Sequence, residues 1–360
     1  MAGSKMDFNF SGNRVFIIAE AGKNFIQTRE EKTSEEYLAN AKELIRLAYE
    51  AGADAVKFQT HNLDDEQFET NITSPHFLGS DRYNWIKRND RAATIDFWKE
   101  LKAFADELGI IFFSTPMSRG AAVKLEEINV PLWKVGSGDI LDFVMLDYLA
   151  QTKKPIILSS GMSTLEEVDR AVEFLKKRES KIALLHCVSR YPCPPDELNL
   201  KTIEFFKNRY KAPIGFSDHS IGFETVLAAV ELGAVIIEKH FSLSRDLWGA
   251  DHKVSMTPDE FEQMVKAARK TQASKLTNLG STDKLLQDEE VVFRPIFRKI
   301  LRASRDLKEG EILEKNDIYA MRPQEDAQDG LPSEDYEKVL GKKLKRDIKK
   351  YDPISRDVIF

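Results

Sequence analysis

The 360-residue chain has few cysteines, no excess of positive charge and no long apolar runs. Two cysteines, Cys187 and Cys193, are too few for a disulfide framework and are typical of a reducing cytoplasm, where we expect the protein to work. A formal net charge of −6 argues against a general surface for nucleic acid or anionic membranes, so an anionic ligand needs local cations. No apolar run approaches the ~20 residues that span a bilayer, which argues against a membrane helix.

Short apolar runs separated by amphipathic segments are abundant instead. Runs that alternate with helices indicate a parallel sheet buried on both faces. Eight runs in about 260 residues predict an α/β fold of the (β/α)8 or TIM-barrel type, and no glycine-rich dinucleotide fingerprint supports the alternative, a doubly wound sheet. The runs are VFIIAE, DAVKFQT, GIIFFST, LWKVGSG, PIILSSG, IALLHC, APIGFSDH and AVIIEKH. The helices expected between them include residues 34–51, 93–108, 165–177, 223–232 and 258–273.

Other segments depart from this alternation. We expect DFNF, at residues 7–10, to form a hairpin strand at the bottom of the barrel. Residues 62–90 are polar and aromatic, and a connection this long is usually functional, so we expect a loop that forms a rim or lid near the site. After a catalytic barrel over residues 1–275, polar residues 276–293 predict a linker. The short strands and turns of residues 294–360 predict a small β-rich domain.

Two apolar runs end in histidines, His219 and His240. In a parallel barrel the carboxyl ends of the strands share one face, and that face carries the active site. Two neutral imidazoles that converge there indicate a metal site, because histidine is the commonest metal ligand. The alternative is that each histidine is a satisfied polar residue at a strand end.

Two lysines, Lys57 and Lys134, lie inside otherwise apolar runs, where an unpaired ammonium would be costly to bury. Both would face the barrel mouth, with serine, threonine and glycine nearby, which predicts a site for phosphate or carboxylate. The alternative is that each lysine pairs with a buried carboxylate such as Glu20 or Glu238.

Nine segments, in order, resemble the sialic acid synthase family, whose members make nonulosonic acids. They are FIIAEAG, AGADAVKFQT, FFSTPMS, WKVGSGD, ILSSGMST, LLHCVSRYP, IGFSDHS, IIEKHF and GADHKVSM. The tail, with LGKKLKRDIKK, resembles the SAF domain of that family, which is similar to type III antifreeze proteins. The resemblance implies condensation of phosphoenolpyruvate (PEP) with an N-acetylmannosamine-type hexose and release of phosphate. It also implies a divalent metal, typically Mn²⁺, with Mg²⁺ or Co²⁺ as alternatives.

The resemblance also assigns roles to residues of this chain. The metal ligands would be His219 and His240, and the acid/base group would be Glu20, with Asp139 near it. The PEP-binding residues would be Lys57, Thr115, Lys134, Ser137, Ser159, Ser189 and Ser217. The sugar-binding residues would be Gln59, Tyr191, Asp251 and Arg322. In the family the antifreeze-like domain of one protomer caps the other protomer's barrel and delivers an arginine, so we expect a domain-swapped homodimer with Arg322 in that role.

The sequence departs from the family pattern at a few positions. Phe25 stands where the family usually has histidine, which we interpret as loss of a polar group near the metal and as suited to a less hydroxylated sugar. Asp139 often is glutamate in the family, Ser189 is asparagine in some branches, and Tyr351 replaces a usual turn glycine. The differences at Phe25, Asp139 and Ser189 bear on the sugar rather than on the reaction.

Several alternatives stay open at this point. N-acetylneuraminate or legionaminate is the favoured product, but it could be pseudaminate, or a 9-phosphate if the sugar arrives phosphorylated. Another enzyme class is a Schiff-base aldolase that uses Lys134 or Lys57. His186 beside Cys187 could be a Cys/His metal site, although a free cysteine is more often a small buried thiol. An ice- or polysaccharide-binding protein is disfavoured by the highly charged tail.

Overall fold

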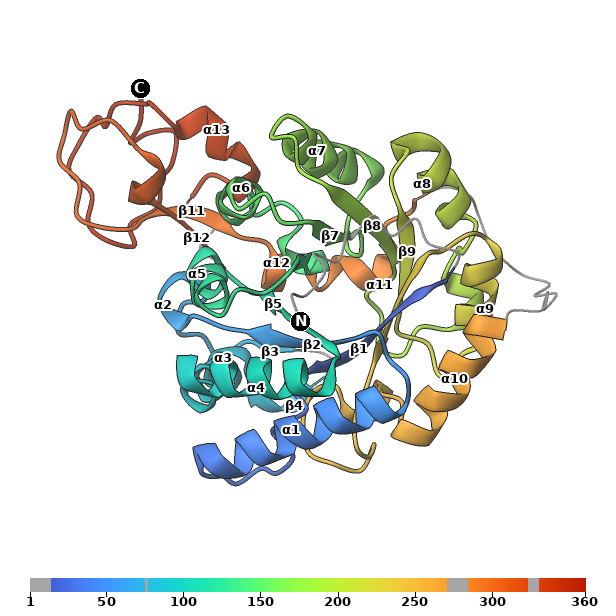
Figure 1. The fold of residues 1–360 in the computed structure, drawn as a ribbon. Coiled ribbons are helices and arrows are strands. Elements are labelled where there is room, and N and C mark those ends of the chain that lie inside the picture. The colour runs from blue at the N-terminus through green and yellow to red at the C-terminus, as the bar shows by residue number, and fades with distance from the viewer. Residues whose placement is uncertain (1–13, 75–76, 271–283, 323–329) are drawn as a thin grey trace.

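The computed structural model describes residues 14–74, 77–270, 284–322 and 330–360. Eight parallel strands form one sheet that curls into a barrel with helices around it, and a smaller C-terminal unit lies against one side (Figure 1). The hairpin strand expected at residues 7–10 and the expected linker up to residue 283 lie outside the described residues. The prediction of a TIM barrel followed by a small β-rich unit is confirmed.

The barrel strands fall on the eight predicted apolar runs. They are β1 (Phe16–Gly22), β2 (Ala55–Thr60), β5 (Ile111–Pro116), β6 (Trp133–Val135), β7 (Ile156–Ser159), β8 (Ile182–Cys187), β9 (Ile214–Asp218) and β10 (Ile236–His240). Hydrogen-bonded ladders run in the order β5-β2-β1-β10-β9-β8-β7-β6, and β5 lies beside β6 at the seam. Each strand is buried on both faces, which is why it is a continuous apolar run in the sequence.

Helices cover the outside of the barrel. They are α1 (Ser34–Glu50), α4 (Ile95–Leu108), α5 (Arg119–Glu127), α6 (Phe143–Gln151), α7 (Leu165–Lys176), α8 (Thr202–Tyr210), α9 (Glu224–Glu231) and α10 (Pro258–Lys270). The five predicted helices are confirmed as α1, α4, α7, α9 and α10. Local sequence fixes where some begin: Thr33 and Glu36 form a capping box at α1, with Thr33 Oγ1 accepting from Glu36 N at 3.2 Å.

The segment at residues 62–90, which we expected to be a loop that forms a rim or lid near the site, does reach the pocket described below through Ser80, Arg82 and Trp85, but it has regular structure. It contains α2 (Leu63–Glu66), the small hairpin of β3 (Thr73–Ser74) and β4 (Phe77–Asp81), and α3 (Arg82–Ala92). Asp81 caps α3 by accepting from Asn84 N at 2.8 Å, and Trp85, Ile86 and Ala92 bury one face of an otherwise polar helix. The narrow apolar stripe explains why the sequence pattern alone did not predict this helix.

The chain from Lys284 onward packs on the barrel rather than running free as a linker. It forms α11 (Asp288–Val291) and α12 (Arg294–Phe297), then the antiparallel pair β11 (Ile300–Ala303) and β12 (Ile318–Met321), and finally α13 (Tyr336–Val339). Tyr351, predicted to replace a turn glycine, has φ +72°, so that turn does need a left-handed residue.

Buried ion pairs join the C-terminal unit to the barrel of the same chain. Lys299 Nζ lies 2.8 Å from Asp142 Oδ2 and 3.3 Å from Asp139 Oδ1. Arg322, which is fully buried, lies 2.9 Å from Asp139 and 3.2 Å from Glu66. Because a buried charge without a partner is very costly, these contacts tie the position of the C-terminal unit to the barrel mouth.

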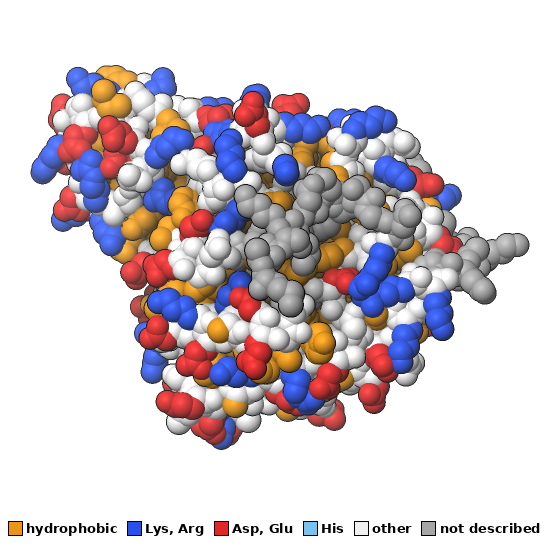
Figure 2. Space-filling view, in the orientation of Figure 1, with side chains coloured by type: hydrophobic (Ala, Val, Ile, Leu, Met, Phe, Trp, Pro, Cys, Tyr) orange, Lys and Arg blue, Asp and Glu red, His pale blue; other side chains and the backbone are white. Residues whose placement is uncertain are grey.

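The surface has a mixed charge. Acidic and basic side chains are interspersed over the face shown in Figure 2, in agreement with the modest net charge of −6. None of the helices in the described part of the chain is long and apolar enough to cross a membrane.

Candidate active site

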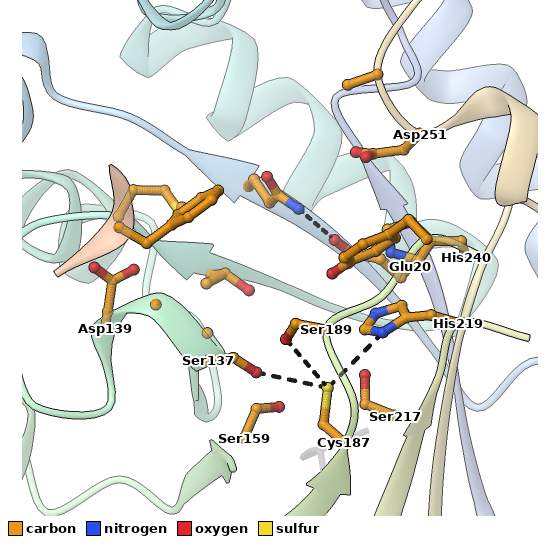
Figure 3. Close-up of a pocket in the computed structure, with 18 of the residues that line it drawn as sticks. Glu20, Ser137, Asp139, Ser159, Cys187, Ser189, Ser217, His219, His240 and Asp251 are labelled. Carbon is orange, nitrogen blue, oxygen red and sulfur yellow. Dashed lines mark hydrogen bonds between the residues drawn. The ribbon is translucent and has the colours of Figure 1, made fainter. Parts of the chain in front are cut away.

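A pocket of about 150 Å³ lies at the carboxyl ends of the barrel strands. All the residues that the sequence predicts for a site line this pocket, except Arg322. Figure 3 shows Ser137, Ser159, Cys187, Ser189 and Ser217 on one side and Glu20, His219, His240 and Asp251 on another. The parallel strands therefore bring together side chains that are far apart in the sequence, as expected for a barrel.

Two lysines and two glutamates form a buried cluster at the floor of the pocket. Lys57 Nζ lies 2.5 Å from Glu20 Oε2 and 3.6 Å from Glu238 Oε2, and Lys134 Nζ lies 3.6 Å from Glu238 Oε1. Lys57 also donates to Thr115 Oγ1 at 3.0 Å, and Lys134 donates to Ser159 Oγ at 2.6 Å. The pairing with Glu20 and Glu238 that the sequence analysis gave as the alternative to an anion site is thus present, and so are the nearby hydroxyl groups expected for an anion.

The two carboxyl groups of this cluster have opposite pKa shifts. Burial raises the pKa of Glu20 above its usual value, although Lys57 pulls it down. Burial acts in the same direction on Glu238, but Lys134 and Lys57 outweigh it and lower the pKa of Glu238 to about 2. Glu238 is therefore a fixed anion, whereas Glu20 can exchange a proton nearer neutral pH. Two neighbouring groups with pKa values pushed apart are typical of acid/base sites.

The two predicted metal ligands lie side by side, on neighbouring strand ends. The ring centroids of His219 and His240 are 5.4 Å apart. His219 Nδ1 donates to Val188 O at 2.8 Å, which fixes the tautomer and leaves Nε2 as a lone-pair donor. His240 Nδ1 is buried without a hydrogen-bond partner, and burial lowers the pKa of this ring to about 3. Burial lowers the pKa of His219 as well, but the neighbouring Cys187 thiol outweighs burial and raises it above its usual value. The free Nε2 of His219 and the neutral ring of His240 are the groups that fit a divalent metal.

The histidine pair has no third protein ligand beside it in the described part of the chain. Within the residues that the structure describes, no group of three or more histidine, cysteine or carboxylate side chains is arranged around one metal position. The alternative that His186 and Cys187 form a metal site is wrong, because His186 points out of the pocket. Its Nε2 lies 2.6 Å from Leu198 O, and its ring stacks on Phe216. Cys187 does line the pocket, 3.6 Å from Ser137 Oγ.

Hydroxyl groups from two strand ends, those of β6 and β8, converge around a glycine that follows β7. Gly161 N donates to Ser137 Oγ at 3.1 Å. A Cβ at Gly161 would lie 2.3 Å from Ser189 Oγ and 2.6 Å from Ser137 Oγ, so only glycine allows the two serines to approach this closely. The resulting cradle of hydroxyls and a backbone turn beside Lys134 suits an anion with several oxygens.

Three of the four residues predicted for the sugar, Gln59, Tyr191 and Asp251, line the pocket near Glu20 and the histidine pair. Gln59 Nε2 donates to Glu20 Oε1 at 2.8 Å. A Cβ at Gly22, which has φ +53°, would lie 3.3 Å from both Asp251 Oδ2 and Glu20 Oε1. The ring of Tyr191 lies 4.1 Å from the ring of His219. Groups that can form hydrogen bonds with a polyhydroxylated ligand therefore lie next to the proposed metal ligands.

We expected Asp139 to lie near Glu20, but in the structure it does not. Figure 3 shows the two carboxylates on opposite sides of the pocket. Asp139 is held by Arg322 and Lys299 instead. The reason is the strand order: Glu20 lies on β1 and Asp139 follows β6, and these strands are not neighbours in the barrel. Arg322 lies behind Asp139 and contacts the barrel of its own chain rather than lining the pocket.

Phe25 does not lie near the metal ligands, so our interpretation that it suits a less hydroxylated sugar is wrong. Its fully buried ring packs on Phe97 at 5.2 Å and on Tyr37 at 6.0 Å, toward α1 and α4. The turn after β1 causes this: Asn24 Nδ2 donates inward to Phe241 O at 2.8 Å, and the next side chain faces the helices.

The sequence analysis missed several residues that line the pocket. They are Lys23, Ser80, Arg82, Trp85, Met117, Met162, Ala250, Phe293 and Phe297. Arg82 is 10% exposed, its Nε and Nη2 have no hydrogen-bond partner, and its guanidinium lies 4.4 Å over the ring of Phe297. Glu238 was considered only as a lysine partner. The signal that identified the two lysines, a charged residue inside an apolar run, also applies to Glu238 and could have identified it as a site residue.

The fold and the pocket define a TIM-barrel protein with a lysine- and hydroxyl-lined site and a C-terminal unit docked at its mouth. Comparison with known families agrees: the NeuB family model matches residues 44–279, and the SAF domain model matches residues 298–357. This chain belongs to the NeuB family. The resemblance found in the sequence is thereby confirmed.

Individual relatives are similar over nearly the whole chain. The N,N'-diacetyllegionaminic acid synthase of Campylobacter jejuni is 34% identical over 91% of this chain and 95% of its own. The human N-acetylneuraminate-9-phosphate synthase is 33% identical over 96% of this chain and 92% of its own. Among solved structures, a spore coat polysaccharide biosynthesis protein of Bacillus subtilis has a TM-score of 0.75 at 32% identity, covering 96% of this chain and 95% of its own.

Proposed function

We propose that this protein condenses PEP with an N-acetylmannosamine-type hexose to form a nonulosonic acid and phosphate. Its relatives in Campylobacter jejuni and in humans are named as synthases of acids of this class, which supports the reaction type. The observation that carries the proposal is that one pocket holds both the buried lysine pair, Lys57 and Lys134, and the histidine pair, His219 and His240. The favoured products are N-acetylneuraminate or legionaminate, with pseudaminate or a 9-phosphate as alternatives.

The lysines and hydroxyls are proposed to hold the carboxylate and phosphate of PEP. Thr115 and Ser159 already accept hydrogen bonds from Lys57 and Lys134, so their hydroxyls are oriented toward this site. Charge-assisted hydrogen bonds in a site that excludes water would hold the phosphate until it leaves. The remaining predicted PEP ligands, Ser137, Ser189 and Ser217, add further hydroxyl groups from β6, β8 and β9.

In the proposed reaction, C3 of PEP attacks the aldehyde carbon of the open-chain sugar, water adds at C2, and phosphate leaves. When an anionic group of PEP engages Lys57, the lysine's pull on Glu20 weakens and the pKa of Glu20 rises further. Glu20 is then able to take a proton from the attacking water or to shuttle protons during sugar ring opening. Gln59 fixes the orientation of Glu20 through its hydrogen bond to Oε1.

His219 and His240 are the residues proposed to hold a divalent metal, of which Mn²⁺ is our first choice. When bound, such an ion supplies a Lewis acid for the aldehyde oxygen of the sugar. Tyr191 and Asp251, next to these histidines, are the residues proposed to orient the sugar hydroxyls.

A phosphate-release assay tests the proposed function. The purified protein is incubated with PEP, Mn²⁺ and a panel of 2-acetamido and 2,4-diacetamido hexoses, each with and without a terminal phosphate. We expect phosphate release only when both PEP and one class of sugar are present. Release that is independent of sugar, or none with any member of the panel, would refute the proposal.

A Schiff-base aldolase is the second candidate, because burial lowers the pKa of Lys134, as an imine-forming lysine requires. Incubation with pyruvate and borohydride separates the two functions by mass spectrometry. An aldolase would gain a covalent adduct on Lys134 or Lys57, whereas the proposed synthase would not.

We also propose that the protein forms a homodimer in which the C-terminal unit of one chain docks on the barrel of the other. The residues that connect α10 to Lys284 lie outside the described part of the chain. The docking surface seen here therefore suits a C-terminal unit from the same chain as well as one from the partner chain. The family matches at residues 44–279 and 298–357 support a division into a barrel over 1–275, a linker over 276–293 and a C-terminal domain over 294–360, in which the linker residues from Lys284 onward pack on the barrel.

A further inference from the structure

Met162 has an unusual backbone conformation at the edge of the pocket. It follows the end of β7, lines the pocket, and has φ +54°, which is uncommon for a residue other than glycine. Such a conformation costs free energy and persists only where the surroundings impose it. At Met162 the surroundings are residues 284–298, which we call the clamp segment.

The clamp segment holds both backbone polar groups of Met162. Its N–H donates to Glu290 Oε1 at 2.9 Å. Its carbonyl oxygen accepts from Arg298 Nη2 at 3.0 Å and from Arg294 Nη1 at 3.4 Å. The two arginines are in turn paired with Glu167, at the start of α7. The left-handed turn after β7 is therefore held in place by side chains of the clamp segment, which is not part of the barrel.

The same oxygen of Glu290 also holds the neighbouring loop. Ser189 N, which follows β8, donates to Glu290 Oε1 at 3.0 Å. Glu290 is fully buried, and its other oxygen accepts from Gln287 N at 3.0 Å. One carboxylate thus joins two loops that come from adjacent strands and belong to the proposed PEP-binding face.

The position of these loops decides the shape of the hydroxyl cradle. Gly161, next to Met162, leaves less room than one methyl group between Ser137 Oγ and Ser189 Oγ. A shift of a few tenths of an ångström in either loop would therefore change how the two hydroxyls face a bound anion. The negative charge of Glu290 is itself met by Lys284, which is fully buried with Nζ 4.0 Å from Oε2.

From these contacts we propose that Glu290 is a positioning residue for the PEP subsite, and that the clamp segment is a working part of the active site. Glu290 does not touch the substrate in this account. It holds Met162 and Ser189 so that the serine hydroxyls face the anion. The inference rests on the proposed function, because it assigns the cradle to PEP.

The test compares Glu290→Ala, Glu290→Gln and the control Glu289→Ala, whose side chain is 54% exposed in the same helix. Removing an acceptor of charge-assisted hydrogen bonds should raise KM for PEP about tenfold or more in Glu290→Ala, with KM for the sugar nearly unchanged. Glu290→Gln keeps an oxygen acceptor and should recover most of the loss. Equal rises in both KM values, or Glu290→Gln as impaired as Glu290→Ala, would indicate a merely structural role and overturn the inference.

Arg298→Ala gives a second test if Glu290→Ala folds poorly, since it removes the hydrogen bond to Met162 O. It should raise KM for PEP in the same direction. Hydrogen exchange provides a readout that needs no turnover: the amides of Met162 and Ser189 should lose protection in Glu290→Ala, and PEP should increase that protection in the wild type. If the wild type shows no PEP-dependent reaction or protection, the proposed function has failed. If the wild type shows both the reaction and the protection, and the variants have the same KM for PEP and the same amide protection as the wild type, only this inference has failed.

Discussion

Lys57 and Glu20 form a buried ion pair across adjacent strands: Nζ lies 2.5 Å from Oε2, and each side chain is 3% exposed. They face each other because β1 and β2 pair in parallel with Glu20 beside Lys57 in the register. This pair places a carboxylate whose pKa is raised by burial next to a lysine that the two glutamates keep charged, which is what a site that binds an anion and moves a proton requires.

Replacing the pocket lysines should impair the use of PEP. In Lys57→Ala or Lys134→Ala, loss of a hydrogen bond to an ionised ligand, at roughly 1.5–3 kcal/mol, should raise KM for PEP or lower kcat by about 10- to 100-fold. Steady-state kinetics at saturating sugar measure this. Lys124→Ala is the control, because Lys124 also pairs with a carboxylate, Asp90, but lies outside the pocket. Unchanged PEP kinetics in both pocket variants would make these lysines structural.

Activity should depend on a metal held by the histidine pair. Chelation should abolish turnover and Mn²⁺ should restore it. His219→Ala should lose bound metal, measured by elemental analysis, while circular dichroism shows an intact fold, since one side chain at a strand end adds little to the core. Full activity of protein shown to be metal-free would contradict the assignment.

Phe25 should matter for stability and not for the choice of sugar. Phe25→Ala removes a buried ring from the aromatic cluster with Phe97 and Tyr37 and should lower the free energy of unfolding by about 3–5 kcal/mol. Chemical denaturation measures the loss, and the sugar panel should give the same order of activity as the wild type. A changed sugar preference with an unchanged free energy of unfolding would indicate that Phe25 contributes to sugar binding.

Much of the barrel and of its site could be predicted from the sequence, for a physical reason. Strands buried on both faces are continuous apolar runs, so a charge inside one, as at Lys57 and Lys134, marks an inward-facing polar site. Asp139 shows the limit of this reasoning. The sequence places it at a strand end but does not show that Arg322 and Lys299 hold it across the barrel from Glu20.

The pocket walls contributed by α3 and by the clamp segment could not be predicted in this way. Arg82 begins a helix whose apolar stripe is narrow, and Phe297 belongs to a four-residue helix just after the predicted linker, where we expected short strands and turns. Phe25 was misplaced because one tight turn decides which way its side chain points. Short helices and turns are positioned by tertiary contacts, which a local pattern does not encode.

The proposed dimer makes a prediction about shared sites. His219→Ala and Arg322→Ala proteins, each nearly inactive, are mixed under conditions that exchange subunits. If the C-terminal unit crosses to the partner, each heterodimer has one intact barrel that receives an intact Arg322. Activity should then return to roughly a quarter of wild type, by statistical pairing in a symmetric dimer.

The outcome shows whether Arg322 contacts the barrel of the partner chain or the barrel of its own chain. If Arg322 serves the barrel of its own chain, as it does in the single chain described here, no heterodimer contains a complete site and mixing restores nothing. Size-exclusion chromatography of both variants is the control, because loss of Arg322 leaves the buried carboxylates of Glu66 and Asp139 with fewer partners and could loosen the assembly.

The most direct test of the central claim is to observe the bond that forms. PEP labelled with ¹³C at C3 and an acetamido hexose labelled with ¹³C at C1 are incubated with the metal-loaded protein, and the product is examined by ¹³C NMR. The account predicts a one-bond carbon–carbon coupling between the two labels in a nine-carbon acid, together with one phosphate released per coupled product. Labelled pyruvate without coupling, or transfer of the phosphoryl group to the sugar, would contradict it.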